Sequence, residues 1–162
     1  MSTRKSVFVV DDDPSMLRGM KRLLREHGFD TGLFASGEAL LRHGDFGKAF
    51  CIILDINLND ESGIDLHRRL TDKGISLPVI YITGNDSPAN RSAALESGCV
   101  AYLTKPFAAQ SLIEPIERVR AAVSWAILGS LINVLFERLR GCALVDRSEP
   151  TKRQRRRKRQ EV

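Results

Sequence analysis

The first 120 residues alternate between two patterns of apolar and polar positions. Short apolar runs rich in β-branched residues are typical of strands that are buried on both faces, as in a parallel sheet. Between these runs, apolar residues recur every three or four positions, which is the period of an amphipathic helix. The predicted strands are Val7–Val10, Thr31–Ala35 (the weakest), Cys51–Leu54, Val79–Ile82 and Val100–Leu103.

Capping residues indicate where the helices begin. Asp13-Pro14 and Ser87-Pro88 each place a favourable N-cap before a proline at the first helical position. Ser36 opens a short second helix. A third helix is predicted over Gly63–Leu70, and a fifth from Ala109 to about Val119.

Glycine and proline mark the helix ends and one irregularity. Gly28 and Gly98 stand where a helix of suitable length needs a left-handed cap. Pro115 must lie near the first turn of the fifth helix or bend it. Five β-α units in series predict an α/β fold, an open parallel sheet with helices on both faces. In such folds, functional residues collect at the carboxyl ends of the strands.

The charge of the chain divides it into parts. Residues 1–120 carry 15 Lys and Arg against 16 Asp and Glu, whereas residues 121–162 carry 10 against 4. The net charge of +5 therefore belongs to the C-terminal part, and it indicates no nucleic-acid contact by the folded body. We expect one domain over 1–120, an apolar helical extension over 121–145 and a basic tail over 146–162.

The cysteines and the N-terminus indicate a reducing compartment. Cys51 and Cys99 lie in apolar runs and are predicted to be small buried hydrophobic residues, and Cys142 stands far from both. The polar N-terminus leads into only four apolar residues, which does not predict a secretory signal. We therefore expect a cytoplasmic location.

Chemically active side chains stand at the ends of four predicted strands. They are Asp11 and Asp12, Asp55, Thr83, and Lys105. Clustered carboxylates raise one another's pKa unless a cation lies among them, and hard oxygen ligands suit Mg²⁺. An aspartate can itself be a nucleophile and form an acyl phosphate. With a lysine for charge and a threonine for a hydrogen bond, the pattern predicts a phosphoryl site.

The order and spacing of these residues are more specific than any one of them. From Asp12 to Asp55 is 43 residues, from there to Thr83 is 28, and Lys105 follows after 22 more. Over residues 5 to about 120, the chain resembles the receiver domain of two-component response regulators. Its Thr-Gly pair and Lys-Pro-Phe context most resemble the nitrogen-fixation-regulator branch. The motifs are Val10-Asp11-Asp12, Leu54-Asp55 with Gly63, Ile82-Thr83-Gly84 and Lys105-Pro106-Phe107.

The resemblance implies a flavodoxin-like (βα)5 fold with strand order 2-1-3-4-5. It implies that Asp55 is phosphorylated from the phosphohistidine of a histidine kinase or phosphotransfer protein. Asp12, Asp55 and the backbone carbonyl of Asn57 would bind Mg²⁺, and Asp11 would act through water. The chain would then be a signalling protein and not an enzyme.

The resemblance also implies a switch. Thr83 and Lys105 would hold the phosphate, with the Lys105-Pro106 bond in the cis form. Thr83 would move toward the phosphate, and Tyr102 would turn inward behind it. The face made by the fourth helix, fifth strand and fifth helix would be remodelled for a downstream protein or a second copy of the chain.

The loop after Asp55 departs from the family pattern. Asn59 stands where the family usually has proline, so the loop is expected to be less rigid. Asn57 and Asn85 lie two residues after Asp55 and Thr83. They flank the path of an attacking water, so they are expected to influence the lifetime of the phosphate.

The C-terminal part does not match that branch, in which a helix-turn-helix domain is expected. Residues 121–136 carry no formal charge and predict an extension of the fifth helix that packs against a partner or second copy. A short membrane-associated helix and a poorly ordered remnant are the alternatives. The basic run at 151–160 is typical of a solvated tail, or of one that contacts phosphate groups without reading sequence.

Two other functions compete with a receiver that signals by protein contact or phosphate relay. One is a transcription regulator acting through the basic tail or a DNA-binding partner, although no direct DNA contact is expected. The other is a phosphatase of the haloacid-dehalogenase type, whose Asp-x-Asp opening fits Asp11 and Asp13. Ser15 stands where that family has threonine, and the acidic pair after its lysine is missing.

Overall fold

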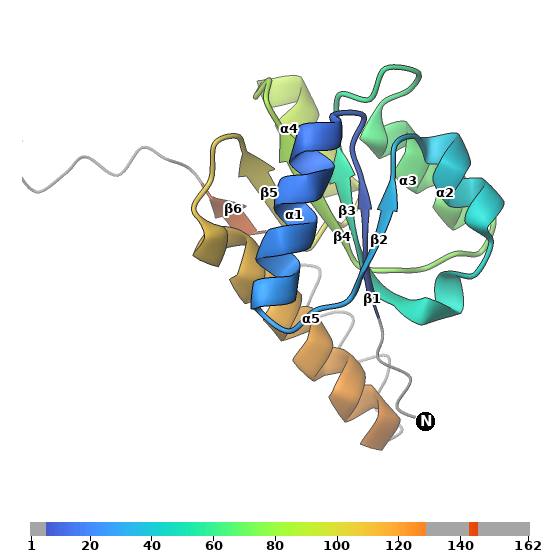
Figure 1. Ribbon diagram of the computed structural model, residues 1–162. Helices are drawn as coiled ribbons and strands as arrows, with labels where there is room; N and C mark the ends of the chain where they lie inside the picture. The colour runs from blue at the N-terminus through green and yellow to red at the C-terminus, as the bar shows by residue number, and fades with distance from the viewer. Residues whose placement is uncertain (1–5, 129–142, 146–162) are drawn as a thin grey trace, which may run out of the picture.

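The computed structural model describes residues 6–128 and 143–145 (Figure 1). Within them, strands and helices alternate along the chain as predicted. The elements are β1 (Ser6–Val10), α1 (Pro14–Glu26), β2 (Thr31–Phe34), α2 (Gly37–His43), the 3₁₀ turn η1 (Phe46–Lys48), β3 (Ala49–Asp55), α3 (Gly63–Asp72), β4 (Val79–Thr83), α4 (Pro88–Glu96), β5 (Ala101–Thr104), α5 (Ala109–Leu128) and β6 (Ala143–Val145).

All strands of the sheet are parallel, in the order β2-β1-β3-β4-β5-β6. The first five strands follow the predicted order 2-1-3-4-5. The sixth was not predicted: β6 pairs with β5, with Tyr102 opposite Leu144. The prediction of a helical extension over 121–145 was therefore wrong at 143–145. An edge strand presents unpaired N–H and C=O groups, and β6 pairs with those of β5.

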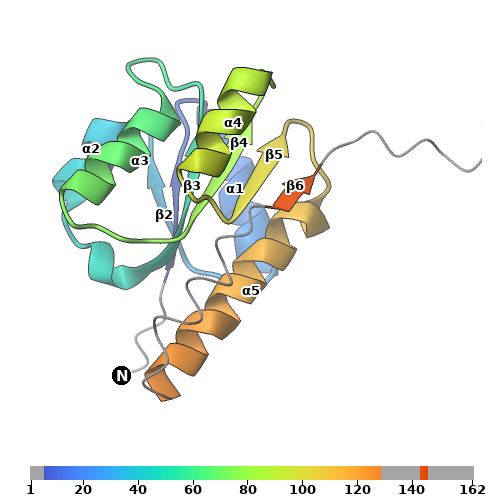
Figure 2. The same ribbon diagram turned by 180° about the vertical axis from the view of Figure 1, so that it is seen from behind.

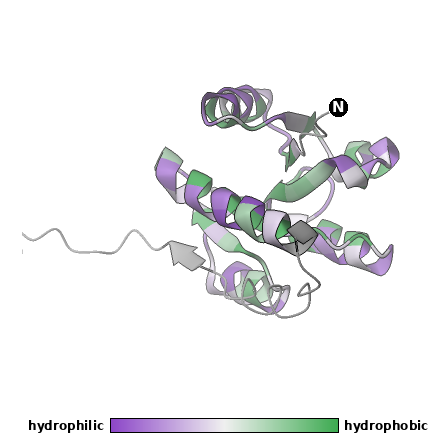
Figure 3. Ribbon diagram, turned by 90° about the horizontal axis from the view of Figure 1, so that it is seen from below, coloured by the Kyte–Doolittle hydropathy of each residue, from purple (hydrophilic) through white to green (hydrophobic). Residues whose placement is uncertain are grey.

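Two layers of helices cover the sheet. Figures 1 and 2 show α1 and α5 on one face and α2, α3 and α4 on the other. Side chains of a strand alternate between faces, so Val9 and Ile53 pack in the layer of α1 and α5. Their neighbours Phe8 and Ile52 pack on the opposite face. The helices carry both hydrophilic and hydrophobic residues along their length, as amphipathic helices do (Figure 3).

The predicted helix caps are confirmed. The side chains of Asp13, Ser36 and Ser87 each accept a backbone N–H from the first turn of α1, α2 and α4. Gly28 and Gly98 have φ of 81° and 74°, the left-handed conformation that other residues adopt at a cost. The caps hold the helix starts close to the carboxyl ends of the strands.

Helix α5 includes the first part of the predicted extension of the fifth helix. It continues past Val119 to Leu128 and contains Pro115 in its second turn. Proline has no N–H to donate, so one helical hydrogen bond is missing there. Within this extension, Trp125 is 71% exposed. No helix among the described residues is long and apolar enough to cross a membrane.

The rest of the C-terminal prediction lies outside the described residues. This applies to 129–142 and to the basic tail from residue 146 onward. The roles proposed for these segments stay predictions.

Candidate functional site

Four neighbouring strands bring the predicted site residues to one edge of the sheet. Asp11 directly follows β1, Asp55 ends β3, Thr83 ends β4 and Lys105 directly follows β5. Because these strands are parallel and adjacent, their carboxyl ends lie side by side. Asp11, Asp55 and Thr83 are the buried polar residues among those that the structure describes. Burial of polar groups costs free energy unless they form hydrogen bonds or ion pairs. All three residues form such contacts at this edge.

Lys105 is the cation among the carboxylates. Its Nζ atom lies 2.6 Å from Oδ2 of Asp55 and 3.1 Å from Oδ2 of Asp11. Burial acts to lower the pKa of Lys105, but the hydrogen bonds and charges of Asp55 and Asp11 outweigh it and the pKa is raised. The Lys105-Pro106 bond is cis, as predicted.

Asp11 retains an unfavourable environment despite this ion pair. Burial raises the pKa of its carboxyl, and the charge of Asp55 adds to the increase. The backbone N–H of Asp13, at 2.8 Å, and Lys105 act in the opposite direction. The site therefore holds more negative charge than one lysine neutralises, which favours a further cation.

Three carboxylates could hold that cation. Asp11, Asp12 and Asp55 each offer an oxygen, and these oxygens all lie within 4.8 Å of one another. Clustered carboxylate oxygens are hard ligands of the kind that Mg²⁺ takes. The chemistry of this donor set fits the predicted ion. The backbone N–H of Asn57 donates to Asp55 Oδ1 at 2.8 Å, but the role of its carbonyl as a ligand stays a prediction.

The hydroxyl of Thr83 is hydrogen-bonded on two sides. It lies 2.9 Å from Oδ1 of Asn57 and 3.0 Å from the carbonyl oxygen of Asn85. It also accepts the backbone N–H of Asn85 at 3.0 Å. A hydroxyl has one proton, so it donates to one of these oxygens at a time. The sequence placed Asn57 and Asn85 near the site but did not predict that they hold Thr83.

The side chain of Tyr102 is buried. It is 1% exposed, and its hydroxyl donates to Oδ1 of Asp86 at 3.0 Å. The movement of Tyr102 that the family resemblance implies stays a prediction. Asp86 was missed because nothing in the sequence pairs it with a residue 16 positions away.

Gly63 allows the helix after the site to approach closely. Its N–H donates to the carbonyl of Ile56 at 2.9 Å. A Cβ atom at this position would collide with the carbonyl oxygen of Asp55 and lie 3.0 Å from its carbonyl carbon. The glycine of the Leu54-Asp55 motif is therefore required by the close contact between α3 and the end of β3.

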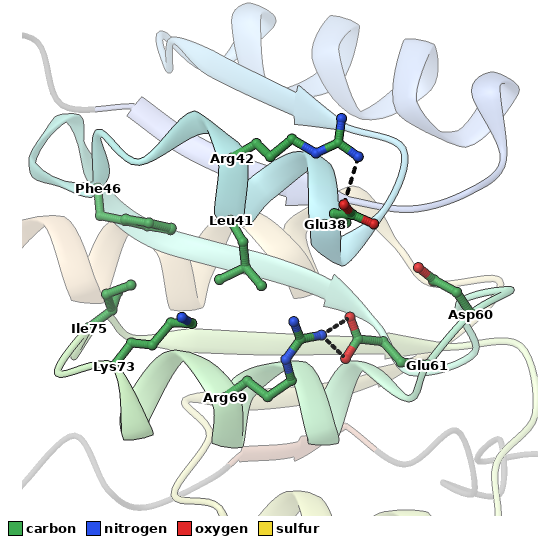
Figure 4. A pocket seen from close by; sticks show the side chains of 9 residues that line it. All are labelled: Glu38, Leu41, Arg42, Phe46, Asp60, Glu61, Arg69, Lys73 and Ile75. Carbon is green, nitrogen blue, oxygen red and sulfur yellow. Dashed lines mark hydrogen bonds and ion pairs between the residues drawn. The ribbon is translucent and has the colours of Figure 1, made fainter.

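A separate groove of about 440 Å³ lies between α2 and α3 (Figure 4). Leu41, Phe46 and Ile75 are its apolar lining. At its rim, Arg69 forms two hydrogen bonds of 2.8 Å to the carboxylate of Glu61. None of the clustered site residues lines it, so the groove does not belong to the carboxylate site.

Comparison with known proteins is consistent with this geometry. The family model of the response regulator receiver domain matches residues 7–117. The chain is 33% identical over 127 residues to the response regulator protein TodT of Pseudomonas putida, covering 78% of this chain and 55% of that protein. It is 35% identical over 115 residues to nodulation protein W of Bradyrhizobium diazoefficiens, covering 71% and 51%.

A solved structure gives the same result for the fold. The BeF3-activated DrrB receiver domain matches with a TM-score of 0.65 and 26% identity, covering 72% of this chain and 97% of that one. The chain spans about half the length of the curated relatives it matches. From the family match and the arrangement of Asp11, Asp55, Thr83 and Lys105, the chain belongs to the response regulator receiver domains of two-component systems.

Proposed function

We propose that Asp55 accepts a phosphoryl group, in the presence of Mg²⁺, from a histidine kinase or a phosphotransfer protein in the cytoplasm. One observation carries the proposal: the Lys105 ammonium bridges Asp55 and Asp11 at 2.6 and 3.1 Å, beside a third carboxylate. The carboxylate that would act as the nucleophile thus lies beside the Lys105 ammonium and beside carboxylate oxygens that could hold a metal ion. Catalysis of phosphoryl transfer consists mostly of such positioning and charge neutralisation.

The step itself is a substitution at phosphorus. An oxygen of Asp55 attacks, the bond from phosphorus to the donor imidazole nitrogen breaks, and the nitrogen keeps the electron pair and takes up a proton. The product is an acyl phosphate on Asp55. Asp11, Asp12 and Asp55 would hold Mg²⁺, which neutralises charge on the phosphoryl oxygens when bound.

The side chains around Asp55 then respond to the new charge. Lys105 transfers its ion pair from the Asp55 carboxylate to the phosphoryl group, and Thr83 donates its hydroxyl proton to a phosphoryl oxygen. Thr83 must first give up its hydrogen bond to Asn57 or Asn85. The altered loop before α4 presents a changed α4–β5–α5 face to a protein target, or to a second copy of the chain.

The test is incubation of the protein with a small-molecule phosphodonor and Mg²⁺, followed by intact mass spectrometry. Wild type gains one phosphoryl group and Asp55→Asn gains none. Asp65→Asn is the matched control, because Asp65 is an exposed aspartate whose partner is Arg68 on the same helix. Equal labelling of wild type and Asp55→Asn overturns the proposal. Turnover of a phosphomonoester by Asp55→Ala would instead support a phosphatase.

A further inference from the structure

The loop between β4 and α4 is held at three consecutive residues. Asn85 is bonded to the Thr83 hydroxyl through both its N–H and its carbonyl. Asp86 is bonded to Tyr102 and Arg91. Ser87 caps α4 by accepting the N–H of Asn90 at 3.1 Å. The loop thus connects the edge of the phosphoryl site directly to the start of α4.

The carboxylate of Asp86 joins three elements. Its Oδ1 atom accepts the Tyr102 hydroxyl of β5 at 3.0 Å and Nε of Arg91 at 3.2 Å. Its Oδ2 atom forms the ion pair with the same guanidinium. The guanidinium of Arg91, in α4, also lies 5.8 Å from the centre of the Tyr102 ring. One carboxylate therefore links the β4–α4 loop with both β5 and α4.

Charge and burial keep this arrangement intact near neutral pH. The hydrogen bond from Arg91 lowers the pKa of Asp86, so its carboxyl is ionised. Burial raises the pKa of Tyr102 to about 12, and the hydrogen bond to Asp86 adds to the increase. Tyr102 therefore keeps the proton that it donates.

The Tyr102 ring is buried, whereas the groups that hold its hydroxyl lie partly at the surface. The side chains of Asp86 and Arg91 are 33% and 27% exposed, so these two groups have room to move. The loop that carries Asp86 is also the one that Thr83 releases when its hydroxyl leaves Asn85.

We propose that Asp86 is the positioning residue that couples the Thr83 hydroxyl to Tyr102 and α4. The proposal rests on the function proposed for Asp55. Movement of Thr83 toward a phosphoryl oxygen frees Asn85, and the loop then carries the Asp86 carboxylate with it. The phenol of Tyr102 and the guanidinium of Arg91 follow, which repositions the α4–β5 face between two discrete arrangements.

The alternative is that Asp86 only stabilises the start of α4. A negative charge near a helix N-terminus is favourable, and an exposed ion pair with Arg91 adds little. Such a role would change stability but not the response of Tyr102 to the phosphoryl site. The two roles can therefore be distinguished by a spectroscopic signal from Tyr102.

The experiment uses the full chain labelled with 3-fluorotyrosine. The sequence contains two tyrosines, so ¹⁹F NMR gives two resonances, which the Tyr81→Phe variant assigns. Trifluoroberyllate with Mg²⁺ serves as the probe of the phosphoryl site. In wild type the Tyr102 resonance shifts on saturation. In Asp86→Asn the probe still binds, and the shift of Tyr102 falls several-fold.

Two further variants complete the test. Asp86→Glu retains the carboxylate and is expected to restore part of the shift. Asp65→Asn removes a different ion-paired aspartate and is expected to respond like wild type. An undiminished Tyr102 shift in Asp86→Asn, with the probe bound, overturns the coupling role alone. Failure of the probe to bind wild type overturns the function of Asp55, and the coupling role with it.

Discussion

Lys105 and Asp55 are 50 residues apart in the chain, yet the lysine ammonium lies 2.6 Å from the carboxylate. A second contact of 3.1 Å joins the same ammonium to Asp11. Lys105 is thus the counter-ion of the carboxylate pair in the described state. The same two carboxylates belong to the cluster that could hold a metal ion. Under the proposed function, Lys105 would act both as a ligand for the phosphoryl group and as a competitor of the cation.

Replacement of Lys105 by methionine separates these two roles. The Lys105 ammonium repels a metal ion bound to the same carboxylates. Without it, the Mg²⁺ dissociation constant is expected to fall roughly tenfold. Phosphoryl uptake from a small phosphodonor should slow, because the positive charge that would neutralise the transferred group is lost. Calorimetric titration with Mg²⁺ and intact mass spectrometry measure the two effects. Lys73→Met, at the C-terminal end of α3, is the control for loss of one positive charge.

Asn57 is expected to restrain the switch. Its side chain lies 2.9 Å from the Thr83 hydroxyl. The proposed function requires Thr83 to give up this contact before it donates to a phosphoryl oxygen. Such a hydrogen bond contributes about 1 kcal/mol, so Asn57→Ala should bind trifluoroberyllate roughly fivefold more tightly at saturating Mg²⁺. The gain should disappear in a Thr83→Ala background. A gain of equal size in that background would show that Asn57 acts by another route.

Gly63 and Gly19 are expected to respond in opposite directions to the same substitution. A Cβ at Gly63 would collide with the backbone carbonyl of Asp55, so Gly63→Ala should lower the free energy of unfolding by about 2 kcal/mol or more. At Gly19, inside α1, a Cβ meets nothing within 4 Å. Gly19→Ala should therefore raise the free energy of unfolding by about 0.5–1 kcal/mol. Urea denaturation monitored by circular dichroism measures both. Equal effects would contradict the packing argument.

His67 is expected to make stability depend on pH. Its Nδ1 atom lies 2.7 Å from the Tyr81 hydroxyl, which is 3.1 Å from Oγ of Ser97. Burial lowers the pKa of His67 from 6.5, so the folded state favours the neutral ring. Below pH 6.5 the unfolded chain takes up a proton on His67 that the folded chain does not. The contribution of His67 to the stability of the folded state is therefore fully present above that pH. It is lost as the pH falls below that value.

The measurement is the free energy of unfolding at about pH 7.5 and about pH 5. His67→Gln keeps a group that can hydrogen-bond to Tyr81 but has no titration in this range. Its loss of stability between the two pH values should be smaller than that of wild type. Parallel losses in the two proteins would mean that the environment of His67 does not favour its neutral form.

Much of the site could be read from periodicity and position. Apolar runs identified the strands, and their parallel arrangement meant that residues after Val10, Leu54, Ile82 and Leu103 share one edge. This is why the cluster of Asp11, Asp55, Thr83 and Lys105 could be predicted from the sequence. The caps at Asp13 and Ser87 were predictable because a cap depends on residues within one helical turn.

The contacts between side chains were decided by the tertiary structure. The contact of Asn57 with Thr83 and that of Asp86 with Tyr102 each join residues far apart in the chain, and no local pattern encodes such a pair. The pairing of β6 with β5 is of the same kind, because a three-residue strand has too little periodicity to be recognised. The sequence by itself determined which groups reach the edge of the sheet, since that follows from local structure and strand direction. Only the tertiary structure decided which of them touch, because that depends on how distant elements pack against one another.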